Sequence, residues 1–329
     1  MTNGRTSPAA PAATVLDYFV VDVFTTSALA GNPLAVVLTT APLATAQMQS
    51  IAREFNLSET TFIERRSPAV EAAEGVRVRI FTTAEELPFA GHPTLGTASV
   101  LRLTAPETAA PHNQGGSVIT LAENVGPIPV RFPDPAGSSL QDQPAPPQAA
   151  ASFFAEMTQR DPEFGAELDP AEVAGLCGLS REDLDQSAPP QVVSTGTAFA
   201  IVLLRSVEAL SRLQVLQKEA TGWLRSRGAR WFYVLAASQS QGSPQEFRAR
   251  MQFNGGEDPA TGSAAGCAVS YLVQRNKASS GAQFLIRQGV EMGRPSEIFV
   301  SARASGARVS DIRVAGSTVL VAKGQLFLP

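Results

Sequence analysis

Two short glycine-containing turns, one in each half of the chain, constrain the fold most strongly. The first is Phe89-Ala-Gly-His-Pro-Thr-Leu-Gly-Thr-Ala98 and the second is Glu257-Asp-Pro-Ala-Thr-Gly-Ser-Ala-Ala-Gly266. Each leads into a helical stretch that is apolar on most sides, through Leu95, Ala98, Val100 and Leu101 or through Ala264, Ala265, Cys267, Ala268, Val269 and Leu272. A helix of this kind lies inside a domain and is wrapped by other elements. The repeat therefore predicts a helix inside a curled sheet, twice, by internal duplication.

Strands are predicted where β-branched and aromatic residues cluster or alternate with polar ones. In the first half they fall at 17–24, 34–38, 61–64, 76–81, 118–122 and 128–132. In the second half they fall at 192–193, 199–204, 232–236, 247–253, 284–287, 297–302, 311–315 and 319–326. Apolar residues at helical spacing predict helices at 44–55, 94–103, 171–177, 181–185 and 263–274. The fold class predicted is α+β.

A proline-rich stretch gives the best domain boundary. Residues 133–150 contain five prolines among Gly, Ser and Gln, a composition typical of a linker. We expect an N-terminal domain at 14–133, a linker at 134–152 and a C-terminal domain at 153–311, with 312–329 a candidate strand for completing the first domain. Residues 1–13 are rich in Ser, Pro and Ala without an apolar core, and are interpreted as a disordered leader rather than a signal peptide.

The composition argues against several other classes of protein. The net charge of −4 leaves no basic surplus for a protein that binds nucleic acid through phosphates. No run reaches the ~18 apolar residues of a membrane helix. Cys177, Cys267, His92 and His112 are the only cysteines and histidines, and their spacing fits neither a zinc site nor a disulfide framework. We expect a cytoplasmic protein in a reducing compartment, with neither a nucleic acid nor a membrane as partner.

The starts of the two apolar helices, Gly91-His92 and Gly262-Ser263, are candidate anion-binding sites. Backbone N–H groups in a first helical turn lack intrahelical partners, and the helix dipole adds positive charge there. For one such turn alone, glycines that only permit tight packing are the more common explanation. Two turns in equivalent places favour a cradle for an anion.

Three side chains near these turns are candidates for acid–base chemistry. Glu59, between a helix end and a strand, would have a raised pKa in an apolar cleft and could act as a base and then an acid; an exposed loop glutamate is the more common alternative. His92 is either a proton donor or a structural histidine. Asp258 either lines the same cleft or caps the second helix, and capping is the more common role. His112 is expected to be exposed, and Cys267 to lie in the core.

Several motifs occur in a fixed order along nearly the whole chain, from about Leu16 to Pro329. They are Asp22-Val-Phe24, Gly31-Asn-Pro33, Asn56-Leu-Ser-Glu-Thr-Thr-Phe62, Phe89-Ala-Gly-His-Pro-Thr94, Glu257-Asp-Pro-Ala-Thr-Gly-Ser263, Gln288-Gly and Met292-Gly-Arg-Pro-Ser296. Together they make the chain resemble the PhzF-like (phenazine biosynthesis) family, within the diaminopimelate-epimerase fold superfamily.

The resemblance implies two similar domains, each a barrel-like curled β-sheet around a central α-helix, with the active site between them. It implies that Glu59 moves a proton on the substrate and that His92 and Asp258 assist. The residues that the resemblance assigns to substrate binding are Ser58, Gly91, Gly262 and Ser263, with backbone amides of the two glycine turns, His92 included, holding a carboxylate.

The implied function is a cofactor-independent isomerase of a small carboxylate-bearing metabolite, similar to trans-2,3-dihydro-3-hydroxyanthranilate isomerase, and the implied assembly is a homodimer. Related epimerases and racemases use a cysteine at each helix start, and neither turn here contains one. A one-base shift by Glu59 is therefore favoured over an amino-acid epimerase or racemase. The other alternative is a catalytically silent protein that binds an anionic metabolite.

No metal or organic cofactor is expected. The chain lacks a cluster of histidine and cysteine ligands, and its glycine turns do not fit the dinucleotide-binding fingerprint. A pyridoxal enzyme needs a lysine for its Schiff base, and Lys218, Lys277 and Lys323 all lie outside the motifs.

Overall fold

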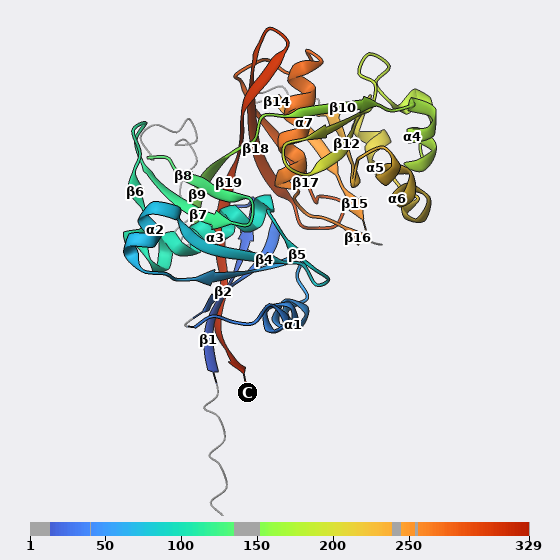
Figure 1. Ribbon diagram of the computed structural model, residues 1–329. Helices are drawn as coiled ribbons and strands as arrows, with labels where there is room; N and C mark the ends of the chain where they lie inside the picture. The colour runs from blue at the N-terminus through green and yellow to red at the C-terminus, as the bar shows by residue number, and fades with distance from the viewer. Residues whose placement is uncertain (1–13, 40, 135–151, 239–244, 254–255, 329) are drawn as a thin grey trace, which may run out of the picture.

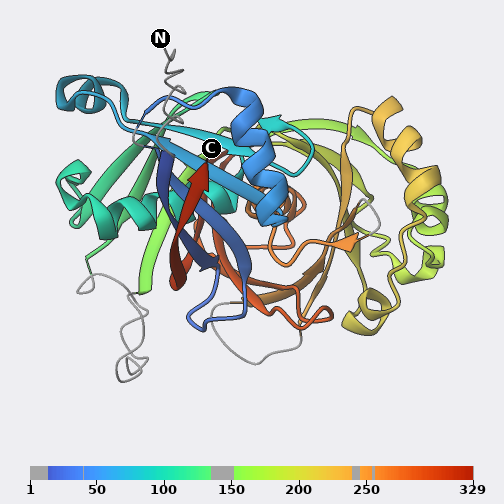
Figure 2. The same ribbon diagram turned by 90° about the horizontal axis from the view of Figure 1, so that it is seen from below.

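The computed structural model describes residues 14–39, 41–134, 152–238, 245–253 and 256–328. The predicted leader and all but the two end residues of the predicted linker lie outside them, so that domain boundary remains a prediction. Figure 1 shows two bodies, one above the other, and Figure 2 shows them from below.

The first body is a closed ring of strands around a helix. Successive pairing joins β1 (Thr14–Val23), β2 (Asn32–Thr39), β3 (Glu59–Glu64), β4 (Val76–Phe81), β7 (Ser117–Glu123), β8 (Gly126–Phe132), β9 (Ser152–Gln159) and β19 (Arg308–Leu328), and β19 pairs with β1 again. Inside lies α3 (Gly91–Thr104), in which every residue from Gly91 to Leu101 is buried. The predicted central helix thus has a strand on every side.

The second body is a similar sheet curled around α7 (Gly262–Gln274), although no pairing among the described residues joins its first strands to its last one. Its strands pair in the order β10 (Glu163–Glu167), β11 (Gln191–Ser194), β12 (Ala198–Leu204), β13 (Trp231–Ala237), β14 (Gln245–Arg250), β17 (Gln283–Gln288), β18 (Ser296–Ser305) and β19.

The two bodies share the same sequence of strand directions. From β1 to β9 the successive pairs are antiparallel, parallel, antiparallel, parallel, antiparallel and antiparallel. The pairs from β11 to β19 follow the same series. In both bodies the central helix falls between the fourth and fifth strands of the series. The predicted α+β fold of two similar barrel-like domains is confirmed.

The remaining elements are small and peripheral. Three helices pack on the outside of the second body, at the right of Figures 1 and 2: α4 (Pro170–Leu176), α5 (Val207–Ser211) and α6 (Gln217–Ser226). Helix α1 (Thr45–Phe55) packs on the first body. The others are α2 (Pro68–Glu74), the short strands β5 (Glu86–Leu87), β6 (Ala110–Pro111), β15 (Gln252–Phe253) and β16 (Gly256–Glu257), and 3-10 turns at Pro106–Thr108 and Arg181–Asp183.

Some predicted elements were wrong in extent. The strands predicted at 311–315 and 319–326 are one 21-residue strand, β19, which pairs with β18, β9 and β1 in turn. Gly316 does not break it; a Cβ there would lie 2.4 Å from Cδ1 of Phe24, so glycine admits that ring. The predicted strand 247–253 is split between β14 and β15, and the predicted helix 181–185 is a single 3-10 turn.

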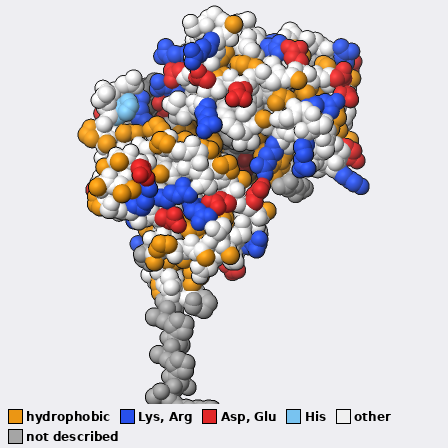
Figure 3. Space-filling view, in the orientation of Figure 1, with side chains coloured by type: hydrophobic (Ala, Val, Ile, Leu, Met, Phe, Trp, Pro, Cys, Tyr) orange, Lys and Arg blue, Asp and Glu red, His pale blue; other side chains and the backbone are white. Residues whose placement is uncertain are grey.

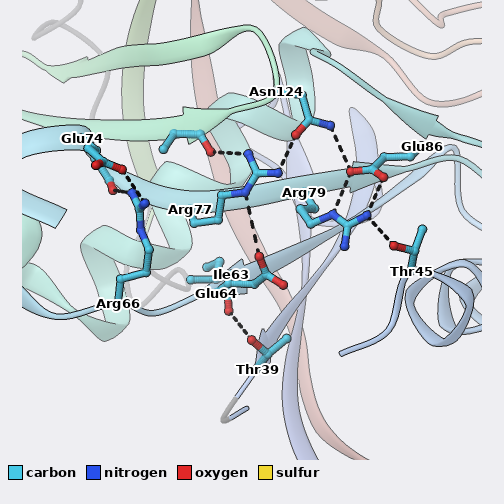
Figure 4. A network of polar contacts seen from close by, with 12 residues as sticks. Thr39, Thr45, Ile63, Glu64, Arg66, Glu74, Arg77, Arg79, Glu86 and Asn124 are labelled. Atoms are coloured by element: carbon cyan, nitrogen blue, oxygen red, sulfur yellow. Dashed lines mark hydrogen bonds and ion pairs between the residues drawn. The ribbon is translucent and has the colours of Figure 1, made fainter. Parts of the chain in front are cut away.

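Charged side chains cover the outer face of the first barrel. In β4, Val76, Val78 and Ile80 point inward, and Arg77 and Arg79 point outward, as their alternation predicts. Arg79 pairs with Glu86 of β5 at 2.5 Å, and Arg77 lies 3.9 Å from Glu64 of β3; Figure 4 shows how these side chains face one another. Half-exposed pairs of this kind contribute about 0–1 kcal/mol each, so the backbone pairing of the closed barrel, more than these pairs, fixes β3.

On the face shown in Figure 3, basic and acidic side chains are interspersed over both bodies. This mixed surface agrees with the small net charge. Among the described residues, no helix combines the length and apolar character needed to cross a bilayer.

Candidate active site

The starts of α3 and α7 meet where the two bodies face each other. A Cβ added to Gly91 would lie 3.0 Å from the backbone N of Ser263 and 3.1 Å from the carbonyl carbon of Gly262. Neither N-cap residue, Ala90 or Thr261, makes a side-chain capping bond. Two helix starts without such caps therefore present first-turn N–H groups to one region, the geometry that favours an anion. Both glycines have negative φ, so close approach is what requires them.

Parallel pairing brings two polar side chains to the same region. β2 and β3 run in parallel with Leu34 opposite Glu59, so both strands begin at the same edge of the barrel. Asn32 is the first residue of β2, and Glu59 is the first residue of β3. The strand order thus places an amide and a carboxyl group near the start of α3.

Asn32 is a buried hub between the two halves of the chain. Its Nδ2 atom donates to Oδ1 of Asp258 at 2.9 Å and to the carbonyl of Ala260 at 2.8 Å, and it lies 3.2 Å from Nδ1 of His92. The first two partners are acceptors only, which identifies this amide atom as the nitrogen. One side chain therefore links the histidine of the first glycine turn to the aspartate of the second.

The contact between Asn32 and His92 fixes the tautomer of the histidine. An amide nitrogen donates hydrogen bonds but does not accept them, so Nδ1 of His92, which faces Nδ2 of Asn32, is the unprotonated ring nitrogen, and the neutral imidazole carries its proton on Nε2. Nε2 lies 3.4 Å from Oε2 of Glu59. Both atoms are buried and lack hydrogen-bond partners among the described residues. The pair is close enough for one small polar group of a ligand to contact both.

Burial sets the protonation states of this pair. It raises the pKa of Glu59 from 4.5 to about 8, with the negative charge of Asp258 as a second cause. It also lowers the pKa of His92 to about 3. At neutral pH the imidazole is therefore neutral, and the carboxyl group of Glu59 gains or loses its proton near pH 8. That range suits a group that must accept and return a proton.

Asp258 is tied into the site by two side-chain donors. Its Oδ2 accepts from Oγ1 of Thr261 at 2.6 Å and its Oδ1 from Asn32. Burial raises the pKa of Asp258 to about 6, and the hydrogen bonds from Thr261 and Asn32 oppose this rise. Of the two roles considered for Asp258, helix capping is wrong, because the N-cap residue of α7 is Thr261 and no side-chain capping bond is made at this helix start.

The other predicted residues fall around this centre or away from it. Ser58 precedes β3 and Ser263 is the second residue of α7; both are half-buried. Cys267 is fully buried one turn further on, with Sγ 3.4 Å from Oγ1 of Thr195, and burial raises its pKa to about 11. His112 lies in the turn after β6, is half-buried rather than exposed, and accepts from the amide of Gln114.

Three further residues of the candidate site, Asn32, Thr261 and Gln288, received no role in the sequence analysis. Gln288 donates to the carbonyl of Asp258 at 2.8 Å and to Oγ1 of Thr261 at 2.9 Å, and its own carbonyl accepts from Tyr233 at 3.0 Å. Asn32 and Gln288 do stand in motifs, Gly31-Asn-Pro33 and Gln288-Gly. Their positions in these motifs could have indicated a functional role. Their hydrogen-bond partners could not be inferred, because most of them lie far away in the sequence.

A second buried carboxyl group, Glu123, lies behind the start of α3. Oγ1 of Thr94 is 2.7 Å from Oε1 of Glu123 and also 2.7 Å from the carbonyl of Ala90. Burial raises the pKa of Glu123 to about 8, although Thr94 and Arg77 oppose this. A protonated Glu123 can donate to Thr94, which then donates to Ala90.

Glu123→Gln is expected to stabilise the protein, and by more at high pH. Between pH 4.5 and about 8 the unfolded chain loses the proton that the folded Glu123 keeps, so wild-type stability falls as the pH rises through this window. Glutamine removes this cost, and the gain should be about 1–3 kcal/mol larger at pH 8 than at pH 5. Urea unfolding at both pH values measures it, with the exposed Glu85→Gln as control. A gain that does not change with pH would contradict the assignment.

The donor set of the site suits acid–base chemistry better than metal binding. Within the described ranges, no group of three or more His, Cys, Asp or Glu side chains is placed to hold a metal ion. Three buried polar atoms of the site have no hydrogen-bond partner among the residues that the structure describes: Oδ1 of Asn32, Oε2 of Glu59 and Nε2 of His92. They are one acceptor, one carboxyl oxygen that can gain or lose a proton, and one N–H donor.

The chain is similar to known proteins over nearly its whole length. Residues 21–324 match the family model PhzC-PhzF, described as phenazine biosynthesis-like protein. An uncharacterised isomerase of Mesorhizobium japonicum is 34% identical over 320 residues, which cover 95% of this chain and 99% of that one. The trans-2,3-dihydro-3-hydroxyanthranilate isomerase of Pseudomonas aeruginosa is 34% identical over 314 residues, with 94% and 99% covered.

A solved structure agrees over the same extent. The structure described as a predicted epimerase from Pseudomonas aeruginosa superposes with a TM-score of 0.74 at 33% identity, covering 94% of this chain and 98% of that one.

Proposed function

The chain belongs to the phenazine biosynthesis-like (PhzC-PhzF) family of isomerases, and we propose that it moves a proton within a small carboxylate-bearing substrate without a cofactor. The proposed substrate is trans-2,3-dihydro-3-hydroxyanthranilate or a close carboxylated relative, after the names of relatives 32–34% identical. The observation that carries the proposal is the buried Glu59 carboxyl group, whose Oε2 lies 3.4 Å from Nε2 of His92 and whose pKa burial raises to about 8.

The substrate carboxylate binds where the two helix starts meet. First-turn N–H groups at Gly91, His92, Gly262 and Ser263 supply the donors, and both helix dipoles favour the negative charge. When the substrate loses a proton, negative charge develops and spreads toward the carboxylate. Fixed N–H donors stabilise such charge without having to reorient.

Glu59 carries the proton. Its carboxylate takes a proton from an acidic carbon of the substrate, so that a C–H bond breaks, an O–H bond forms and the double bond shifts. The O–H bond then breaks as Glu59 delivers the proton to a second carbon. The product has the same composition as the substrate, and Glu59 returns to its starting state.

His92 and Asp258 act on the polar end of the substrate. The N–H at Nε2 of His92 stands ready to donate to a substrate oxygen, because Asn32 occupies Nδ1. Asp258 holds Asn32 in that role through Oδ1. The charge on Asp258 also contributes to the high proton affinity of Glu59.

A racemase that uses two thiols is the less favoured function. The second residues of α3 and α7 are His92 and Ser263, and the nearby Cys267 is a buried thiol with a raised pKa. A thiol with that pKa forms little thiolate at neutral pH.

The reaction run in deuterated water tests the proposal. The enzyme is dialysed exhaustively against a strong chelator and then given trans-2,3-dihydro-3-hydroxyanthranilate. We expect an isomeric product of unchanged composition, with solvent deuterium entering if Glu59 exchanges its proton before returning it. Activity lost on dialysis and restored by a metal or cofactor would contradict the cofactor-independent mechanism. Bound but unchanged substrate would instead indicate a silent binding protein.

The pH dependence of kcat/KM follows from the state of Glu59. Because its pKa in the free enzyme is about 8, the basic form becomes more abundant as the pH rises. We expect kcat/KM to increase about tenfold per pH unit well below pH 8 and to level off above it. Titration of Asp258 near pH 6 is expected to alter the slope there. A profile that is flat from pH 6 to pH 9 would contradict Glu59 as the base.

We also propose a cytoplasmic homodimer. The two free thiols, Cys177 and Cys267, are both buried and suit a reducing compartment. The dimer rests on the resemblance of the motifs to the family, and analytical ultracentrifugation of the full chain tests it.

A further inference from the structure

The stretch from Gln288 to Ser296, here called the 288–296 segment, includes two of the sequence motifs and contacts both halves of the site. We propose that Arg294 of this segment, together with Asp22, is a positioning residue for the proton transfer: the pair holds the loop before Asn32 so that Asn32 engages His92 and Asp258. The inference rests on the proposed function for its kinetic part, and its spectroscopic part is independent of the substrate.

Arg294 reaches across to the first body with several bonds. Its Nε donates to the carbonyl of Gly31 at 2.8 Å, and its Nη2 donates to the carbonyl of Ala30 at 2.9 Å. The same Nη2 donates to Oδ1 of Asp22 at 2.6 Å, while Oδ2 of Asp22 accepts from the amide of Leu29 at 2.7 Å. The guanidinium group thus fixes the two residues immediately before Asn32.

The loop needs such support because two bulky residues in it are strained. Phe24 has φ of +64° and Leu29 has φ of +68°, in the left-handed region that residues with a Cβ rarely adopt. Strained backbone persists only where surrounding contacts hold it. Two of those contacts involve residues close to Arg294 in the sequence. The amide of Gly31 donates to the carbonyl of Pro295 at 3.0 Å, and the amide of Glu297 donates to the carbonyl of Phe24 at 2.7 Å.

Phe24 connects this loop to the anion cradle. Its ring is fully buried, and a Cβ on Gly262 would lie 3.0 Å from its Cζ. The start of α7 therefore rests on the first residue of the strained loop, and Asn32 follows the last. A change in this loop would reach both the cradle and the Asn32 hub.

The 288–296 segment also holds the turn that carries Asp258. A Cβ on Gly289, whose φ is +75°, would lie 2.3 Å from the carbonyl O of Arg294 and 2.6 Å from that of Pro259. Gln288 bonds to the backbone of Asp258 and to Thr261. The 288–296 segment thus contacts the backbone just before Asn32 and also the backbone at Asp258, the two residues that the Asn32–Asp258 bond joins.

Buried charge makes the Asp22–Arg294 pair more than a surface ion pair. The side chain of Asp22 is 3% exposed, and that of Arg294 is 28% exposed. Removing the guanidinium group would leave the buried carboxylate of Asp22 without its charged partner, which is costlier than losing an exposed pair. Loop movement that relieves this cost would displace Asn32.

The first test compares kcat in four variants. Arg294→Gln and Asp22→Asn are expected to lower kcat roughly 10- to 100-fold, because sub-ångström misplacement of groups near the reacting atoms has effects of that order. Arg294→Lys keeps the charge and part of the bonding, so a smaller loss is expected, and it serves as the milder variant if Arg294→Gln does not fold. The control is Arg303→Gln, which removes an exposed arginine bonded to Asp311 and should leave kcat within about twofold.

A mutant cycle separates positioning from general stability. If Arg294 acts through Asn32, the Arg294→Gln loss should shrink to about threefold or less in an Asn32→Ala background. Equal losses in both backgrounds would overturn the proposal, because they would show that Arg294 acts independently of Asn32.

Imidazole nitrogen NMR gives a readout without substrate. The chain has only His92 and His112, so a His112→Asn variant assigns both sets of signals. Wild-type His92 should show a proton on Nε2 and an unprotonated Nδ1 that is hydrogen-bonded to Asn32. The Asn32→Ala variant should give the chemical shift of an Nδ1 atom that has lost this bond. Arg294→Gln is expected to move this signal toward the Asn32→Ala position, whereas Arg303→Gln should not.

The two kinds of failure are distinguishable. A wild-type enzyme without isomerase activity would contradict the proposed function, and the NMR result would then decide the positioning role alone. A folded Arg294→Gln variant with the wild-type His92 spectrum would overturn the positioning role even if the isomerase activity is established.

Discussion

Glu59→Gln is expected to lower kcat by about 10²- to 10⁴-fold while the protein still folds and binds ligand. Glutamine matches the size of glutamate but cannot accept and return a proton, and general acid–base catalysis contributes an effect of this size. Folding should not suffer, because burial already favours the neutral form of Glu59. Steady-state kinetics and binding of 3-hydroxyanthranilate, an aromatic analogue of the proposed substrate, separate the two effects.

The matched control for this variant is Glu64→Gln. Glu64 ends the same strand that Glu59 begins, and its carboxylate faces Arg77 on the outer side of the barrel. The substitution is chemically identical, yet kcat should stay within about twofold of wild type. A Glu59→Gln enzyme that keeps more than a tenth of wild-type kcat would remove Glu59 from the mechanism.

Gly91→Ala is expected to weaken binding of 3-hydroxyanthranilate roughly 10- to 100-fold, which corresponds to about 1.4–2.8 kcal/mol. The new methyl group would meet backbone atoms of Gly262 and Ser263 at 3.1 Å and 3.0 Å. These atoms belong to the backbone at the start of the buried helix α7, which cannot move aside as a flexible side chain can. The methyl group should therefore separate the two helix starts and cover the N–H of Ser263.

The control for this variant places the same methyl group where space is open. A Cβ on Gly222, within α6, meets nothing within 4 Å, and Gly→Ala inside a helix usually stabilises. Calorimetry with 3-hydroxyanthranilate and with its uncharged carboxamide completes the test. Wild type should prefer the carboxylate, and Gly91→Ala should lose that preference. Unchanged preference in Gly91→Ala would place the carboxylate elsewhere.

The fold was largely predictable because its signal is local and repeated. An apolar helix after a glycine turn needs a surrounding sheet, and the pattern occurs twice in the sequence. The elements that escaped prediction have weak local signals. Helix α6 buries only Ala220 and Leu224 on a mostly polar sequence, and β9 begins at the edge of the proline-rich stretch.

The members of the candidate site could be chosen from the sequence, but the contacts that join them could not. Glu59, His92 and Asp258 stand in motifs, and each is a residue type suited to acid–base chemistry. The bond from Asn32 to Asp258 spans 226 positions, and only the meeting of two barrels brings these residues together. The tautomer of His92 depends on its contact with Asn32, 60 positions away, so no local pattern could have indicated it.

The long strand β19 has a consequence for how the protein is made. It lies beside β9 and β1 and closes the first barrel, yet it follows every other described strand in the chain. While a ribosome is still synthesising the second half, the first barrel therefore lacks a strand, and the edges of β1 and β9 remain unpaired. Open strand edges can pair with the wrong neighbour. The nascent N-terminal half should consequently depend on chaperones until β19 emerges, and it should not become protease-resistant before then.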